Sequence, residues 1–203
     1  MNKSIKKTAI LSSVPVLAIA FVAIVSSLQA NALTTPTTVS SAIGSIISVL
    51  TSSGTVSLNS TPSASGVQTI ASDTVTVSTN NAAGYTLQLN ETTAASALVS
   101  GGNSIPATSG TYGTPVAQSV NTWGYRVDGL GTFGAGTTSA VSNAAIGAAT
   151  FAAVPATASP QTIKTTSATA TNDTTTVWYG VAVNTATPSG TYTNSVTYTA
   201  VTN

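Results

Sequence analysis

The stretch that decides the fold is residues 73–90, DTVTVSTNNAAGYTLQLN. Apolar and polar residues alternate on both sides of segment 80–84, and the apolar ones are Val75, Val77, Tyr85, Leu87 and Leu89. Such a period of two predicts two strands, each with one buried face and one hydroxyl-coated face. Because segment 80–84 is rich in Asn and ends in Gly, the sequence favours a turn and therefore a β-hairpin.

A second pair of strands is predicted near the C-terminus. Alternate positions from Val177 to Val183 are apolar, and Thr187-Pro188-Ser189-Gly190 has the proline and glycine positions of a β-turn. The run 191–201 then alternates again, with one apolar face made of Tyr192, Val196, Tyr198 and Ala200. The outer face of this strand is almost entirely threonine, which suits a pleated surface.

Weaker strand signals occupy much of the remaining chain. Strands are expected at 42–50, 55–58 and 122–127, and two short ones between 144 and 170 around Pro155 and Pro160. Segment 33–41 is expected to be a mobile lead-in or an edge strand, and 91–120 is rich in turns. The glycine-rich segment 128–139 is a candidate flexible, functional loop. Many short strands with turn residues between them predict an all-β fold, an antiparallel Ig-like β-sandwich.

Residues 1–32 have the features of a signal peptide. Three lysines precede a largely apolar run from Ala9 to Val25, and Ala30-Asn31-Ala32 provides a cleavage site before Leu33. We therefore expect export to the extracellular space or cell surface, with residues 33–203 as one domain. The absence of cysteine excludes disulfides, and we expect no membrane span in the mature chain.

Charge is scarce after the signal peptide. The 203 − 32 = 171 mature residues contain 38 Thr and 23 Ser, no His and no Cys, and only six charged side chains: Asp73, Glu91, Arg126, Asp128, Lys164 and Asp173. Catalysis and metal binding need proton-transfer groups, thiolates or ligand clusters, so we expect no enzyme, no cofactor and no metal site. Two basic residues cannot form a patch for nucleic acid.

The large aromatic side chains are the candidate binding residues. The candidates for a wall or ligand surface are Tyr85, Trp123, Tyr125, Trp178 and Tyr198. The alternative is that they form the core, because aromatic residues dominate core energetics. Lys164 is the one lysine of the mature chain, and a Lys–Asn isopeptide bond assisted by Glu91 is a further hypothesis.

Two segments resemble WxL-type cell-wall domains of bacteria. Asp73–Leu89 resembles the segment leading into the first Trp-x-Leu motif of those domains, with Tyr85-Thr86-Leu87 in its place. Gly190–Val201 is similar to their closing strand, with Tyr198-Thr199-Ala200 where a second motif would lie. The resemblance implies non-covalent attachment to peptidoglycan, although neither tryptophan is retained at the matching positions.

These features together predict an exported, non-catalytic cell-surface protein that is wall-associated or structural. Its partners would be wall polysaccharide, peptidoglycan or other surface proteins. One alternative is a self-assembling subunit of a surface layer or fibre, a homo-oligomer built by strand addition at an edge such as 33–48 or the C-terminal strand. The other alternative is a carbohydrate-binding adhesin with an exposed tryptophan.

Overall fold

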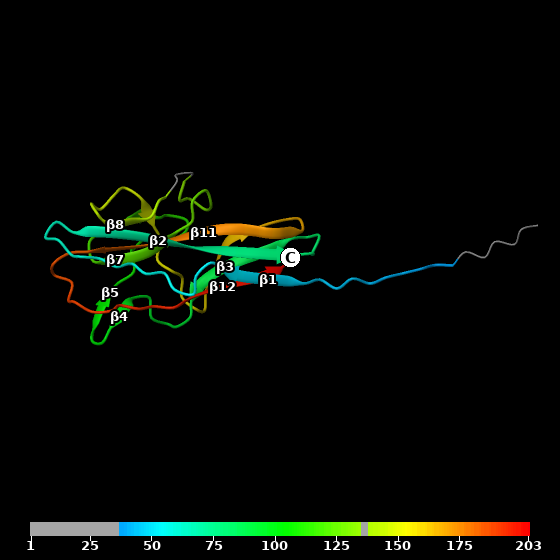
Figure 1. Cartoon of the computed structure of the whole chain (residues 1–203), viewed down its shortest axis with the longest axis horizontal. Coiled ribbons are helices and arrows are strands. Elements are labelled where there is room, and N and C mark those ends of the chain that lie inside the picture. Colours follow the sequence, from blue (N-terminus) through cyan, green and yellow to red (C-terminus); the bar gives the residue numbers. More distant parts are fainter. Residues whose placement is uncertain (1–36, 135–137) are drawn as a thin grey trace, which may run out of the picture. The chain divides into compact units, whose positions relative to one another are not determined.

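The computed structural model describes residues 37–134 and 138–203 (Figure 1). The chain divides into two units, Met1–Ser41 and Ala42–Asn203, and the strands of the described residues lie in the second unit. The predicted signal peptide, residues 1–32, and residues 135–137 of the glycine-rich segment lie outside the described residues. The described residues form strands, turns and loops without a helix, which confirms the all-β prediction.

The strands of the described residues vary from two to fourteen residues in length. They are β1 (Ile47–Thr51), β2 (Val67–Thr79), β3 (Tyr85–Glu91), β4 (Leu98–Ser100), β5 (Asn103–Ile105), β6 (Val116–Ala117), β7 (Thr122–Arg126), β8 (Val141–Ala144), β9 (Thr150–Phe151), β10 (Gln161–Thr165), β11 (Ala170–Val183) and β12 (Val196–Thr202).

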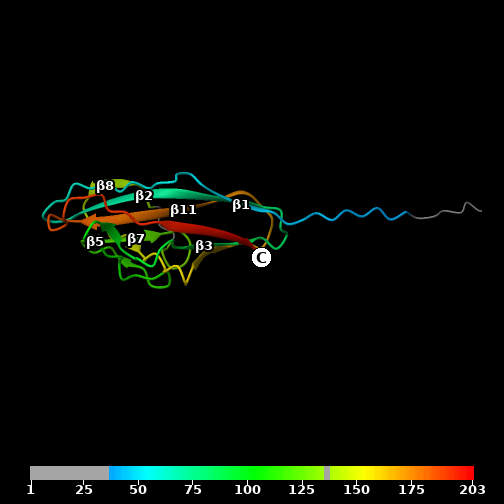
Figure 2. The ribbon, with the colours of Figure 1, turned by 90° about the horizontal axis from the view of Figure 1, so that it is seen from below.

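Two antiparallel sheets form the body of the second unit. The five-stranded sheet has the order β1-β2-β11-β7, and β8 also pairs with β2. The three-stranded sheet has the order β10-β3-β12. The small pairs β4-β5 and β6-β9 are antiparallel as well. The long strands β2 and β11 run side by side, with β3 in the layer beneath them (Figure 2).

The two main sheets share one hydrophobic core. Val75, Val77 and Val177 of the five-stranded sheet are fully buried, and they belong to the same cluster as Leu87 and Leu89 of the three-stranded sheet. Burying one such side chain contributes about 1.5–3 kcal/mol. The alternation noted in the sequence therefore specifies the inward faces of a sandwich-like, two-layer arrangement.

The predicted hairpin at 73–90 is wrong, because β2 and β3 lie in different sheets. β2 pairs with β11, and β3 pairs with β12. The connections β2–β3 and β11–β12 therefore both cross from one sheet to the other. Alternation determines which side of a strand is buried, but a strand can bury that side against a facing sheet as well as beside a hairpin partner.

The turn at 80–84 shows how the chain crosses between layers. Asn81 Oδ1 accepts a hydrogen bond from the Ala83 N–H at 3.0 Å, and Gly84 has a φ of 84°. A Cβ at position 84 would lie 2.4 Å from the Thr166 carbonyl oxygen. This turn therefore requires glycine, both for its backbone conformation and for the close approach of the chain that follows β10.

Two strand predictions near the N-terminus need correction. Segment 42–50 is a strand only from Ile47 onward, and segment 55–58 has no strand partner. Asp73 Oδ1 accepts hydrogen bonds from Ser52 Oγ and the Ser53 N–H, at 2.8 and 3.1 Å. These side-chain contacts replace the next step of the ladder, so the chain leaves β2 at this point.

The described part of the glycine-rich segment, residues 128–134 and 138–139, is anchored on the core. Phe133 is buried and meets Tyr112 and Tyr125 edge-on, each with ring centroids 5.7 Å apart. Asp128 pairs with Arg126 and also accepts a hydrogen bond from Thr138 Oγ1 at 2.8 Å. An aromatic anchor and a bonded carboxylate therefore hold this segment on the core.

Candidate functional site

A groove of about 850 Å3 lies on the side of the sandwich. It lies between segment 53–60, which follows β1, and segment 187–198, which leads into β12. Its floor consists mainly of side chains from the inner face of the five-stranded sheet and from β4 and β5: Trp123, Tyr179, Val181, Val183, Leu98 and Ile105. The groove begins where β12 begins, so the segments 53–60 and 187–195 cover this part of the core in place of the three-stranded sheet, and Trp123, Tyr179 and Val181 are only 3–6% exposed.

One wall of the groove is a strip that we call the lip, residues 55–58. Val56 and Leu58 pack on the core, while Thr55 and Ser57 face outward. Within the described residues, the backbone groups of Val56 and Ser57 make no hydrogen bond. The lip therefore combines a strand-forming sequence with unpaired backbone donors and acceptors at the edge of a cavity.

The opposite wall is held firmly by its neighbours. Thr193 and Val99 of β4 exchange two backbone hydrogen bonds, each of 3.0 Å. The Asn194 side chain donates to the carbonyl oxygens of Ala95 and Ala97, at 2.9 and 3.1 Å. Tyr192 donates its hydroxyl proton to the Pro188 carbonyl oxygen. The two walls therefore differ, since one is cross-linked by hydrogen bonds and the other has free backbone groups.

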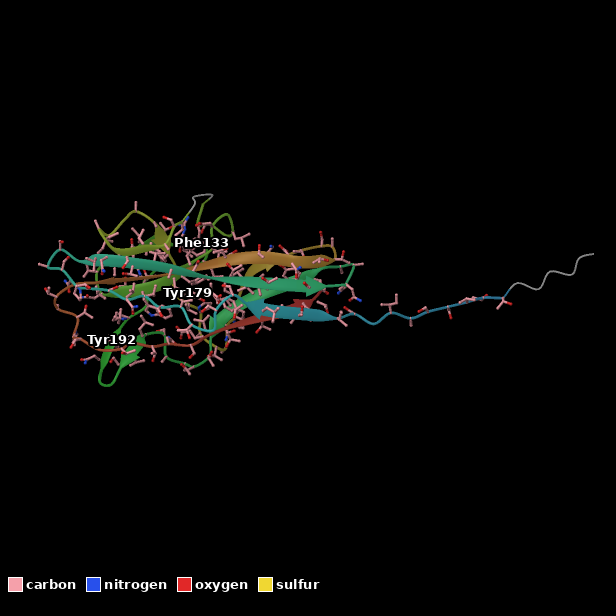
Figure 3. All side chains as sticks on the ribbon, viewed as in Figure 1. Phe133, Tyr179 and Tyr192 are labelled. Carbon is pink, nitrogen blue, oxygen red and sulfur yellow. The ribbon has the colours of Figure 1, made fainter. Side chains whose placement is uncertain are left out.

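A pair of tyrosines closes the inner end of the groove. The hydroxyl groups of Tyr179 on β11 and Tyr198 on β12 lie 2.7 Å apart and join the two sheets. Figure 3 shows Tyr179 in the middle of the unit, with Tyr192 toward the β4–β5 hairpin. Burial raises the pKa of both Tyr179 and Tyr198 well above the ordinary value. Both side chains therefore remain neutral hydroxyl groups at physiological pH.

The groove is almost free of charge. Asp73 is the one charged residue of its lining, and its carboxylate is already bonded to Ser52 and Ser53. The other lining residues carry hydroxyl, amide or apolar side chains. Such a lining fits an uncharged ligand, either an extended peptide segment or a neutral saccharide, because burying an unpaired charge costs far more than burying hydrogen-bonded neutral groups.

The structure separates the five predicted site residues. Trp123 and Tyr198 line the groove, although Trp123 is mostly buried and donates its indole N–H to the Ser96 carbonyl oxygen at 2.9 Å. Tyr85 and Tyr125 are fully buried in the core, as in the alternative interpretation. Trp178 is half-buried and alternates with Tyr179, so it lies on the other face of β11.

Other residues of the groove were missed by the sequence analysis. The sequence predicts a short strand at 55–58, which includes Val56 and Leu58, and a terminal strand at 191–201, which includes Tyr192 and Asn194. The structure places these four residues in the lining of the groove. The sequence feature that could have indicated the lip is the position of residues 55–58 between the weak strand signal at 42–50 and the loop at 60–66. No sequence pattern indicates that the lip lacks a partner, since that depends on contacts of Asp73.

The remaining carboxylates each have separate neighbours. Asp173 accepts hydrogen bonds from Lys164 Nζ at 2.6 Å and Tyr85 at 2.8 Å. Burial acts to raise the pKa of Asp173, but the bonds from Lys164 and Tyr85 outweigh it and lower the pKa. Glu91 instead contacts Asn194. The structure thus pairs Lys164 with a carboxylate rather than with an asparagine, and the contacts of Glu91 lie elsewhere.

Metal binding finds no support in residues 37–134 and 138–203, which bring together no cluster of three or more His, Cys, Asp or Glu side chains. The same residues include no helix of the length and hydrophobicity that a membrane crossing requires. The chain matches no family model, no curated protein and no solved structure. The WxL-type resemblance therefore stays a prediction.

Proposed function

We propose that this chain is an exported, non-catalytic structural protein of the cell surface that assembles through the edges of its sandwich. The observation that carries the proposal is the chemistry of the edge strands β1 and β12. Each is the outermost strand of its sheet, and the two strands lie next to each other. Their unpaired sides offer backbone donors and acceptors to a further strand.

Neither edge strand has the protection that soluble proteins usually place on an exposed edge. Charged residues, prolines and bulges normally discourage pairing with another chain. The edge strand β10 has such features, a bulge and Lys164. In contrast, no charged residue occurs between Lys7 and Asp73 or after Asp173, and exposed apolar side chains occur on both edges: Val49, Leu50 and Val201.

The other parts of the proposal rest on the sequence and on the site geometry. Export follows from the predicted signal peptide, and wall association from the WxL-type resemblance. The carboxylates that hold structural hydrogen bonds leave little material for acid–base chemistry, which supports a non-catalytic role. We interpret the fold as Ig-like because two packed antiparallel sheets are joined by connections that cross between them.

The proposal is tested by sedimentation of the exported product. The full chain is expressed in an exporting bacterial host, and the secreted protein is purified and spun with and without cell-wall sacculi. Self-assembly predicts concentration-dependent sedimentation without walls, which Leu50→Lys on β1 should reduce. Val116→Lys, on the distant strand β6, is the matched control. A protein that stays monomeric at high concentration, with and without walls, would contradict the proposal.

Carbohydrate binding is the second candidate function, and the groove favours it. Trp123 and Tyr192 line a groove that is rich in hydroxyl and amide groups and has one charged lining residue, Asp73. Of the two tryptophans, Trp123 lines the groove and Trp178 does not. A bound neutral glycan should therefore quench tryptophan fluorescence in Trp178→Phe but not in Trp123→Phe. If no glycan on a broad array quenches the fluorescence of the parent protein, this function is excluded.

A further inference from the structure

We propose that the groove receives residues 39–43 of a second copy of this chain, so that copies join head to tail. The inference rests on the proposed function and names the partner and the surfaces of the assembly. Two features of the described residues carry it: an exposed apolar segment and a groove whose lip has no strand partner.

The donor segment, which we call the arm, is residues 37–46. Its large apolar residues are Val39, Ile43 and Ile46, which are 91%, 84% and 70% exposed. In an extended segment, Val39 and Ile43 would lie on the same face as Ile47, because they are eight and four positions before it. The Ile47 side chain packs on the core at the start of β1. The inward-facing apolar row of β1 therefore continues in the sequence beyond the residues that its own core covers.

The receptor surface is the groove with its lip. An extended segment entering the groove could pair with the free backbone groups of Val56 and Ser57 and lay alternate side chains on the floor. Addition of a strand to an unpaired edge gains affinity from the backbone hydrogen bonds and specificity from pockets for alternate side chains. Neither the arm nor the lip carries a charge, and the one charged residue of the groove lining, Asp73, already accepts hydrogen bonds from Ser52 and Ser53.

The length of the groove fits the spacing of the arm residues. The floor extends along β11 from Tyr179 to Val183, four residue steps or about 13 Å. Val39 and Ile43 are also four residues apart, which is again about 13 Å in an extended segment. One arm can therefore place both side chains over the apolar floor while Ser41 lies between them.

The end of the arm that joins β1 is fixed away from the groove. Asn80 bonds to the Ile46 N–H at 2.8 Å and to the Gly44 carbonyl oxygen at 2.9 Å, which fixes the start of β1 opposite Thr79. From Thr79 back to Asp73, where the groove begins, β2 covers about 20 Å, whereas Val39 to Ile43 spans about 13 Å. Arm and groove are thus different surfaces, and such a contact generates an open chain of subunits.

Single cysteines test which surfaces meet, because the chain has no cysteine of its own. Full-length Ser41→Cys, in the arm, is expressed, exported and mixed with Thr191→Cys, in the groove wall, and a short bismaleimide reagent is added. The control mixture replaces the groove variant with Ser142→Cys, an exposed residue on β8. We expect a covalent dimer in the first mixture and none above background in the control.

Three results would overturn the inference. They are no dimer in the first mixture, equal dimer in both mixtures, or a dimer formed mainly by Ser41→Cys alone, which would mean that arms pair with arms. If sedimentation shows assembly while the first mixture gives no dimer, the arm–groove contact is refuted and assembly at the edges stands. If neither experiment shows association, both ideas fail.

A pair of charge variants checks that the apolar face of the arm is responsible. Ile43→Asp, added to the arm cysteine variant, should reduce cross-linking at least about tenfold, because a buried isoleucine contact is lost and a charge enters the groove. Ser40→Asp adds the same charge on the opposite face of the extended arm and should retain most of the cross-linked dimer. Both residues are exposed in the single chain, so folding is unaffected. An equal reduction by the two variants would contradict the docking.

Discussion

Glu91 should make this protein less stable as the pH rises from 4.5 to 8. The side chain is 0% exposed, its Oε1 lies 3.4 Å from Asn194 Nδ2, and its Oε2 has no hydrogen-bond partner. Burial raises the pKa of Glu91 from 4.5 to about 7, and the hydrogen bond from Asn194 opposes this only in part. The native protein therefore favours the protonated, neutral acid.

The sign and size of the effect follow from proton linkage. Between the two pKa values the folded state holds a proton on Glu91 that the unfolded chain has released, so the free energy of unfolding falls as the pH rises. The window lies between pH 4.5 and about pH 7. Each unit of pKa difference corresponds to 1.36 kcal/mol, which gives a total loss of about 3 kcal/mol. No histidine titrates in this window, because the chain has none.

Urea unfolding at pH 4.5, 6 and 8 measures this loss directly. Glu91→Gln keeps the shape and the hydrogen bond of the neutral acid, so its free energy of unfolding should change little across the range. Asp173→Asn is the matched control, because Asp173 is a partly exposed, ion-paired carboxylate whose pKa is lowered. Asp173→Asn should lower the free energy of unfolding, but this free energy should still fall with rising pH as it does in the parent protein. Equal slopes for the parent protein and Glu91→Gln would refute the reasoning.

Three further predictions concern the core and the covalent state. Tyr179→Phe should lower the free energy of unfolding by about 1 kcal/mol in urea, because the Tyr198 hydroxyl loses its partner, and Tyr192→Phe should cost less. Gly84→Ala should lower the free energy of unfolding by about 1–3 kcal/mol, whereas Gly54→Ala, where a Cβ meets open space, should leave it unchanged. Equal melting curves for the two variants would contradict this prediction. The intact mass of the exported chain should show no deficit of about 17 Da, since Lys164 forms an ion pair rather than an amide.

The inward faces of the strands could be predicted from the sequence. Val75, Val77, Leu87 and Leu89 alternate with polar residues and are all fully buried, as expected for strands with one face in the core. The all-β class follows from the same signal. Strand partners could not be predicted, because the same alternation serves a hairpin and two facing layers. The hairpin predicted at Asn80–Gly84 is a crossing between layers for this reason.

The candidate site could be predicted only in part. Trp123 and Tyr198 do line the groove, but aromatic composition alone could not separate them from Tyr85 and Tyr125, which the two sheets bury completely. Burial of an aromatic ring depends on which sheet covers it, and a single strand carries no such information.

The sequence by itself determined the composition of the surface and the period of its strands. Threonine-rich alternation and the near absence of charge are local properties, so they can be read one segment at a time. Only the tertiary structure decided where a strand stops pairing. Asp73 lies on β2, and its bonds to Ser52 and Ser53 remove the lip from the ladder and open the groove. These residues are about twenty positions apart in the chain, and only folding brings them into contact.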